Sequence, residues 1–230
     1  MKTLLFLLTF CITSLSAQEI MVKKTEKTYD LATNQAIDLN LKFAKNITIR
    51  TWNQPQLKIV RTLKTDQEEM IKRHVMKVQA GQQNLEIIAD LTDHKTWKRF
   101  NCTTSCDQEN RENSRWGDRE CACSELTFEI TLPATANLRV ETINGDIEIR
   151  DFNGRLHAKS INGFVDVDWE EARGADIYFH TIHGDIYSDF ALESTLRKEM
   201  FPKIRTDWQG GGEKLELETI NGNIFFRKSK

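Results

Sequence analysis

The sequence is poor in proline, in blocks of like charge and in long apolar segments. Its 230 residues include 3 prolines, which leaves no room for a proline-rich linker, so we expect a single continuous body. The formal net charge is −2 and charges of both signs are interspersed, so neither nucleic acid nor an anionic membrane is an implied partner. No segment approaches the ~20 apolar residues that span a bilayer, so no integral membrane segment is expected.

The N-terminus has the pattern of a secretory signal peptide. Lys2 precedes an apolar run over residues 4–12, and small residues lead to Ala17. We therefore expect residues 1–17 to be a signal peptide that is cleaved after Ala17. Cys11 lies inside the apolar run without the small-residue context of a bacterial lipoprotein site. The mature chain is expected in the periplasm, at the cell surface or in the medium.

Four copies of one short phrase occupy the C-terminal half. They are E-T-I-N-G-D-I at 141–147, K-S-I-N-G-F-V at 159–165, H-T-I-H-G-D-I at 180–186 and E-T-I-N-G-N-I at 218–224. A degenerate copy contains Gly154, so Gly145, Gly154 and Gly163 are spaced nine residues apart. A strand, a tight Asn-Gly turn and a second strand, repeated at a fixed period, predict a β-solenoid with a unit of about nine residues.

Aligning the nonapeptides predicts which side chains are buried. One expected column contains Ile143, Phe152 and Ile161, and another contains Ile147, Leu156 and Val165. Burial of such columns is the main driving force for stacking, on the order of 1.5 to 3 kcal/mol for each large residue. The intervening polar positions are expected to face water: Asp146, Glu148, His157, Asp166 and Asp168.

Two other structures are compatible with Asn-Gly repeats. An antiparallel meander is the commonest meaning of the dipeptide, but it gives no reason for the same columns to recur every nine residues. Calcium-binding nonapeptide rolls need G-G-x-G-x-D, whereas each unit here has one glycine. The solenoid is the preferred interpretation.

The chain upstream of the repeats also alternates apolar and polar residues. Residues 37–60 are expected to form half-buried strands, and 65–73 a short helix capped by Thr65 or Asp66. A hairpin is expected over 75–78 and 85–91, and a strand over 126–132. We divide the mature chain into N-terminal strands, helix and hairpin (18–92), a Cys-rich insertion (93–124) and the repeat region (125–230).

Residues 124–149, S-E-L-T-F-E-I-T-L-P-A-T-A-N-L-R-V-E-T-I-N-G-D-I-E-I, followed by further N-G units, resemble the bacterial "putative adhesin" domain family. The resemblance covers residues 36–228. It implies that the chain is a single-domain, all-β solenoid. It also implies that the chain is an exported protein, like the members of this family, whose function is largely unassigned. The chain departs from the family pattern in the Cys-rich insertion and in residues 191–212, where a helix is expected over 193–200.

The insertion holds four cysteines, Cys102, Cys106, Cys121 and Cys123, as C-x3-C and C-x-C. In an exported chain they are most simply two disulfides that staple a polar loop. A zinc site of four thiolates is the alternative, although C-x-C is a less typical zinc spacing. Of the three connectivities, the nested one, Cys102 with Cys123 and Cys106 with Cys121, best fits a hairpin-like insertion.

The same insertion carries Trp97, Phe100 and Trp116. These aromatics are the candidate ligand-binding residues, because they could stack on sugar rings or anchor a protein partner. The alternative is that they cover the solenoid as a plug. The possible partners are a surface polysaccharide or an envelope protein.

No motif predicts an active site. Exposed carboxylates such as Asp146, Asp166, Asp168 and Asp185 could serve a glycosidase or lyase, but a solvated coil face requires polar residues there anyway. His157, His180 and His183 could meet on adjacent turns, yet no catalytic pattern surrounds them. We expect no catalytic residue, cofactor or metal, and an adhesin-like interaction module. The alternatives are a carbohydrate-active enzyme on a β-helix and a structural cell-envelope protein.

Overall fold

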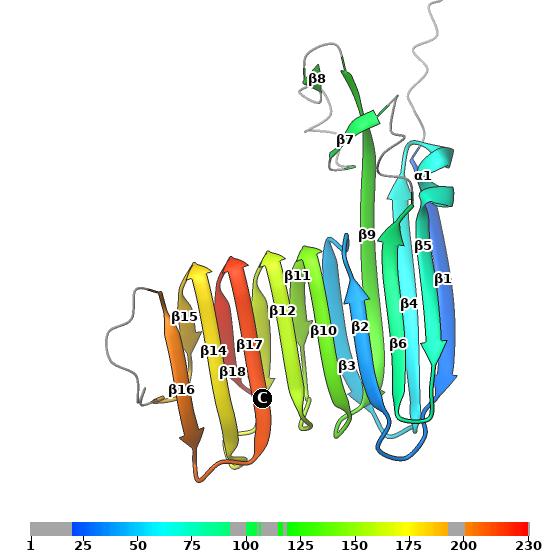
Figure 1. Ribbon diagram of the computed structural model, residues 1–230. Helices are drawn as coiled ribbons and strands as arrows, with labels where there is room; N and C mark the ends of the chain where they lie inside the picture. Colours follow the sequence, from blue (N-terminus) through cyan, green and yellow to red (C-terminus); the bar gives the residue numbers. More distant parts are fainter. Residues whose placement is uncertain are drawn as a thin grey trace, which may run out of the picture.

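The computed structural model describes residues 20–92, 100–104, 106, 115–116, 119–192 and 201–229. In this part of the chain the fold is all-β, as predicted, with one short helix (Figure 1). The strands form two mixed sheets, which we call sheet A and sheet B. Within the described residues, no helix combines the length and apolar character needed to cross a membrane.

In spatial order, sheet A consists of β1 (Met21–Asp30), β4 (Gln56–Thr65), β9 (Arg119–Pro133), β3 (Asn46–Trp52), β11 (Asp146–Ile149), β13 (Val165–Trp169), β18 (Ile224–Lys228) and β15 (Ile186–Ser188). Sheet B consists of β16 (Lys203–Trp208), β14 (Ala175–His183), β17 (Glu213–Asn221), β12 (Leu156–Asn162), β10 (Asn137–Asn144), β2 (Ala36–Leu41), β6 (Asn84–Leu91) and β5 (His74–Ala80). Two short strands, β7 (Phe100–Thr104) and β8 (Arg115–Trp116), pair with the N-terminal part of β9.

The core lies between the two sheets. Side chains alternate between core and solvent along each strand, so Leu138 and Val140 of β10 are buried while Arg139 is exposed. The same alternation places Ile147 and Ile149 of β11 in the core from the opposite sheet. This alternation is what the period of two in the sequence predicts.

The elements predicted upstream of the repeats are confirmed, with one difference at the helix. Helix α1 (Glu68–Arg73) connects β4 to the hairpin formed by β5 and β6. Its N-cap is Gln67, with no side-chain capping bond, rather than Thr65 or Asp66. The Thr65 hydroxyl instead accepts a bond from the Gln67 N–H (3.1 Å) and donates one to the Cys123 carbonyl (2.8 Å).

The structural repeat is eighteen residues, twice the spacing of the glycines. Leu138 is in register with Leu156 in sheet B, and Ile147 with Val165 in sheet A. Successive nonapeptides therefore alternate between the sheets. Leu156 is buried but lies across the core from Ile147 and Val165, so the predicted column of these three is wrong.

The other predicted column is also wrong. Thr142 and Ser160 are buried, and alternation turns Ile143 and Ile161 to the outer face, where they are half-buried. Only Phe152 is fully enclosed. The inward hydroxyls satisfy backbone groups, because Thr142 donates to the Leu41 carbonyl and Ser160 to the Gly145 carbonyl (both 2.8 Å).

The repeats do not stack in chain order. Strand β17 lies between β12 and β14, and β18 lies between β13 and β15. The last copy of the repeated phrase thus separates the second copy from the third (Figure 1). Strand β16 then pairs antiparallel with β14 and ends sheet B.

Candidate functional site

The predicted ligand-binding aromatics lie in or beside the least described part of the chain. Trp97 and residues 193–200, where a helix is expected, fall outside the described residues. The backbone of Phe100 begins β7 and that of Trp116 ends β8, and both strands pair with β9. The structure thus brings two of the three aromatic positions to β9, while their role stays a prediction.

A disulfide fixes the insertion to the body. It joins Cys106 to Cys123, with Cα atoms 5.0 Å apart, so the nested pairing is wrong. The side chains of Cys102 and Cys121 lie outside the described part. Among the described residues no group of three or more His, Cys, Asp or Glu side chains is arranged to hold a metal ion.

Hydrogen bonds to carboxylates explain why Cys106 lies against Cys123. Glu125, which is buried, accepts the Cys106 backbone N–H (3.0 Å) and the Lys45 ammonium (2.8 Å). Asp66 accepts the Cys123 backbone N–H (3.0 Å). Such charge-assisted bonds are stronger than neutral ones, so both ends of the disulfide are held by the body of the protein.

A pocket of about 410 Å³ opens beside this root of the insertion. Its wall includes Lys45, His74, Ser124, Glu125 and Asp146, and the apolar part of the wall comes from Phe43, Leu91 and Leu126. The volume falls within the range of small-ligand sites, which are commonly lined by apolar side chains with a few polar groups. Sequence reasoning missed this pocket, because the segment between β2 and β3 and the strands β5, β6, β9 and β11 bring its residues together from distant positions in the chain.

His74 and Ser124 form the one nucleophile–base contact in the pocket wall. His74 Nε2 lies 2.9 Å from Ser124 Oγ. Burial, with a smaller contribution from the nearby Arg61 charge, lowers the pKa of His74 to about 4. A hydrolase triad has a carboxylate that stabilises the imidazolium. A neighbouring cation does the reverse, so His74 is a weak general base.

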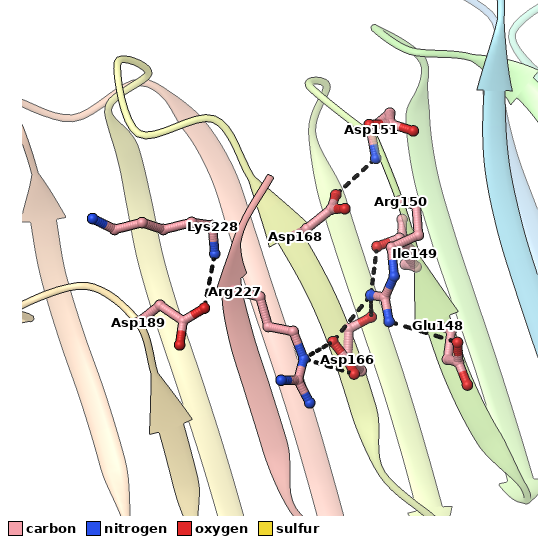
Figure 2. Close-up of polar contacts among 9 residues, drawn as sticks. All are labelled: Glu148, Ile149, Arg150, Asp151, Asp166, Asp168, Asp189, Arg227 and Lys228. Atoms are coloured by element: carbon pink, nitrogen blue, oxygen red, sulfur yellow. Dashed lines mark hydrogen bonds and ion pairs between the residues drawn. The ribbon is translucent and has the colours of Figure 1, made fainter. Parts of the chain in front are cut away.

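The repeat carboxylates are bound to protein groups. Asp166 in β13 was predicted to face water, but it is buried. It bonds to Arg150, next to the end of β11, and to Arg227, near the end of β18 (Figure 2). Its carboxylate lies 3.0 Å from Arg150 Nη1 and 2.9 Å from Arg227 Nε. This carboxylate is therefore occupied by two guanidinium groups of the protein instead of being presented to a ligand.

The neighbouring Asp168 also binds the backbone. Burial raises its pKa, while the Asp151 backbone N–H, which donates to it at 2.7 Å, opposes that shift. Asp146 likewise accepts the Phe164 backbone N–H (3.0 Å). Both carboxylates therefore bind backbone N–H groups that lie next to the ends of neighbouring strands.

The three repeat histidines do not form a cluster. His157 lies in β12, while His180 and His183 lie in β14, and β17 separates these strands. The expectation that they meet on adjacent turns is therefore wrong. His157 Nε2 instead contacts Glu218 Oε1 of β17 at 3.0 Å.

Known proteins resemble this chain in structure but not in sequence. No family model matches the chain, and no curated protein matches it. A putative cell adhesion protein from Clostridium sporogenes matches with a TM-score of 0.53 at 12% identity, over 90% of this chain and 100% of the other. A putative adhesin from Bacteroides fragilis matches with a TM-score of 0.34 at 10% identity, over 90% and 97%. The first likeness shows a shared fold.

Proposed function

We propose that the protein is an exported, non-enzymatic, adhesin-like interaction module built on a β-solenoid. Each solenoid turn would consist of one strand of sheet B and one of sheet A, with the last turn inserted before the third. The partner would be a surface polysaccharide or an envelope protein. It would be located in the periplasm, at the cell surface or in the medium. The Cys106–Cys123 disulfide supports this location, because disulfides are typical of oxidising compartments.

The observation that carries the proposal is the anchored root of the insertion. Binding residues commonly lie on loops that a rigid scaffold positions. Here the scaffold holds the root through the Cys106–Cys123 disulfide and through the Glu125 and Asp66 carboxylates. Many repeat side chains, by contrast, are occupied in the core, in asparagine ladders or in ion pairs. The shared fold with a putative cell adhesion protein agrees with this role.

The binding test compares two double variants on a glycan array and against envelope extracts. Trp97→Ala with Trp116→Ala removes two aromatics of the insertion. Tyr187→Ala with Phe201→Ala removes two exposed aromatics of the body, whose side chains are 50% and 39% exposed. We expect the first variant to lose binding and the second to bind like wild type. Equal binding by both would refute the insertion as the binding site.

Catalysis is tested separately with a panel of polysaccharides. The wild-type protein should release no oligosaccharide or unsaturated product. Cleavage that disappears in Asp168→Asn would replace the interaction module with a carbohydrate-active enzyme. Asp168 is the better choice for this variant, because replacing Asp166 disturbs two arginines at once.

A further inference from the structure

The interior between the two sheets ends in a cationic pocket on the side of β1 and β5. Both strands are edge strands, β1 of sheet A and β5 of sheet B. The pocket has a volume of about 200 Å³. Its wall comes from β1, β4, α1 and β5: Lys23, Thr25, Lys27, Arg61, Leu63, Ile71, His74 and Met76.

Strand register places Lys23 and Lys27 on the core-facing side of sheet A, where both side chains remain exposed at the edge. Lys23 is paired with Leu63 and Lys27 with Ile59, and both partners are almost completely buried. Directly opposed residues of an antiparallel pair lie on the same face of the sheet. Thr25, paired with Arg61, lies between the two lysines. The inner face of this edge therefore presents three cations, whereas Lys24 lies on the outer face.

The charge of Arg61 is not balanced by a carboxylate. Its Nη2 donates to the His74 carbonyl (2.9 Å), which is at the C-cap of α1. Its Nε is buried and has no hydrogen-bond partner. Among the described residues, no ion pair involves Arg61, Lys23 or Lys27, and the pocket wall contains no Asp or Glu. Asp166 and Glu125, the buried carboxylates, are both paired with cations.

Edge protection accounts for only part of this arrangement. Inward-pointing lysines on an edge strand discourage pairing with other chains. That role does not require a third cation deeper in the interior, where burial lowers the pKa of Arg61. Arg61 is half-buried, and a cation that is partly removed from water without a counter-charge is stabilised by an anionic partner.

We propose that this pocket, formed by Lys23, Lys27 and Arg61 beside Thr25, binds a small oxyanion group. The group is a sulfate, a phosphate or a carboxylate, either free or carried by a larger molecule. The guanidinium and the two ammonium groups supply its charge-assisted hydrogen bonds. The proposal does not depend on the adhesin-like function, since the described wall of the pocket comes from β1, β4, α1 and β5 and includes no residue of the insertion.

The test titrates the full mature chain with sulfate, phosphate and acetate at constant ionic strength, using chloride as the reference. Saturable shifts of the backbone amides of β1 and β4 are expected in the wild-type NMR spectrum. Lys23→Gln with Lys27→Gln should weaken binding by about tenfold or more, since two nearby charges are lost. The control, Lys24→Gln with Lys58→Gln, removes the same charge from the outer face and should bind within about twofold of wild type.

The His74 imidazole provides a second readout. Part of the depression of its pKa is due to the charge of Arg61, so a bound anion should raise that pKa in wild type more than chloride does. The Lys23, Lys27 variant should lose this increase. Absence of saturable binding to all three anions, or equal weakening in both double variants, would overturn the proposal.

Oligosaccharides distinguish the two sources of the group. Sulfated and uronate hexasaccharides are compared with a neutral hexasaccharide of equal length, in wild type and in the Lys23, Lys27 variant. Tighter binding of the acidic sugars that disappears in the variant assigns a polymer-borne group. Binding of the free ions alone assigns a free anion. Acidic-sugar binding that is lost only in the Trp97, Trp116 variant would refute a polymer-borne ligand here while leaving the adhesin-like function intact.

Discussion

Gly163 lies directly against Gly145 of the neighbouring repeat: a Cβ on Gly163 would be 2.1 Å from the Gly145 carbonyl oxygen. The φ angle of Gly163 is +154°, which L side chains rarely adopt. The same contact recurs at 2.1 Å between Gly222 and Gly163, and at 2.0 Å between Gly184 and Gly222. These glycines are therefore required by the close approach of the backbones of neighbouring repeats.

We predict that Gly163→Ala lowers the free energy of unfolding by about 3 kcal/mol or more, because the backbones at Gly163 and Gly145 must separate. The control is Gly210→Ala, which also has positive φ but no atom within 4 Å of the added Cβ. It should cost only about 1–2 kcal/mol of backbone strain. Urea denaturation measures the free energy of unfolding of both variants. An equal loss of stability in the two would contradict the close packing of Gly163 against Gly145.

Asp166→Asn should also destabilise the protein, by about 1–3 kcal/mol, because it leaves two arginines without their shared counter-charge. The loss could be as small as the lower end of this range because the Arg227 side chain is 48% exposed, so that water already screens its charge. Glu148→Gln is the matched control, since Glu148 is 38% exposed and contacts Arg150 at 3.6 Å. It should change stability by less than about 0.5 kcal/mol. A neutral Asp166→Asn would show that solvent already screens this cluster.

The sequence predicted local features of the fold better than its global order. Asn-Gly corners and alternating residues are local signals, and they gave the strands, the hairpin and the helix. The eighteen-residue repeat was missed because the nonapeptides alternate between two sheets that have the same apolar pattern. The prediction that Ile143 points into the core was wrong because the corner between the two strands contains one additional residue. Thr142 therefore takes the inward position.

The position of β17 between β12 and β14 can be inferred from the sequence only through the charges of the repeats. In spatial order, the first position of the phrase reads Glu141, Lys159, Glu218 and His180. The opposite charges of Lys159 and Glu218 lie side by side, which chain order would not give. The candidate pockets had no signal, because their walls combine residues from strands far apart in the chain. The cysteine pattern likewise did not predict the partner of Cys106. The Cys106 backbone N–H is held beside Cys123 by Glu125, which lies outside that pattern.

Stability should fall between pH 6.5 and pH 4 because of His74. Its pKa is about 4 in the folded protein, compared with 6.5 for an unperturbed histidine side chain. The unfolded chain therefore binds the proton first, and stability present above pH 6.5 is lost as the pH falls to about 4, by on the order of 3 kcal/mol. His74→Gln should flatten this part of the stability curve, measured by urea denaturation. An unchanged slope would assign the pH dependence to other groups.

The Cys106–Cys123 disulfide should stabilise the protein by about 3 kcal/mol, the loop-closure estimate for a loop of this length. Its sequence separation is 17 residues. Cys106→Ser with Cys123→Ser should lower the denaturation midpoint, while the strands of the repeat region keep their circular dichroism. Peptide mapping without reductant should find Cys106 linked to Cys123. A linkage of Cys106 to Cys121 would contradict this arrangement.

The position of β17 between β12 and β14 can be tested by engineered cross-links on the outer face of sheet B. Lys159 of β12 is in register with Glu218 of β17, and Glu218 is in register with His180 of β14. Adjacent strands are about 4.8 Å apart, within reach of a disulfide, whereas two strand spacings exceed its limit of about 7 Å. Lys159→Cys with Glu218→Cys should therefore cross-link on mild oxidation, and Lys159→Cys with His180→Cys should not. Peptide mapping separates these links from those of the native cysteines. The reverse pattern would mean that the repeats stack in chain order, with β14 beside β12.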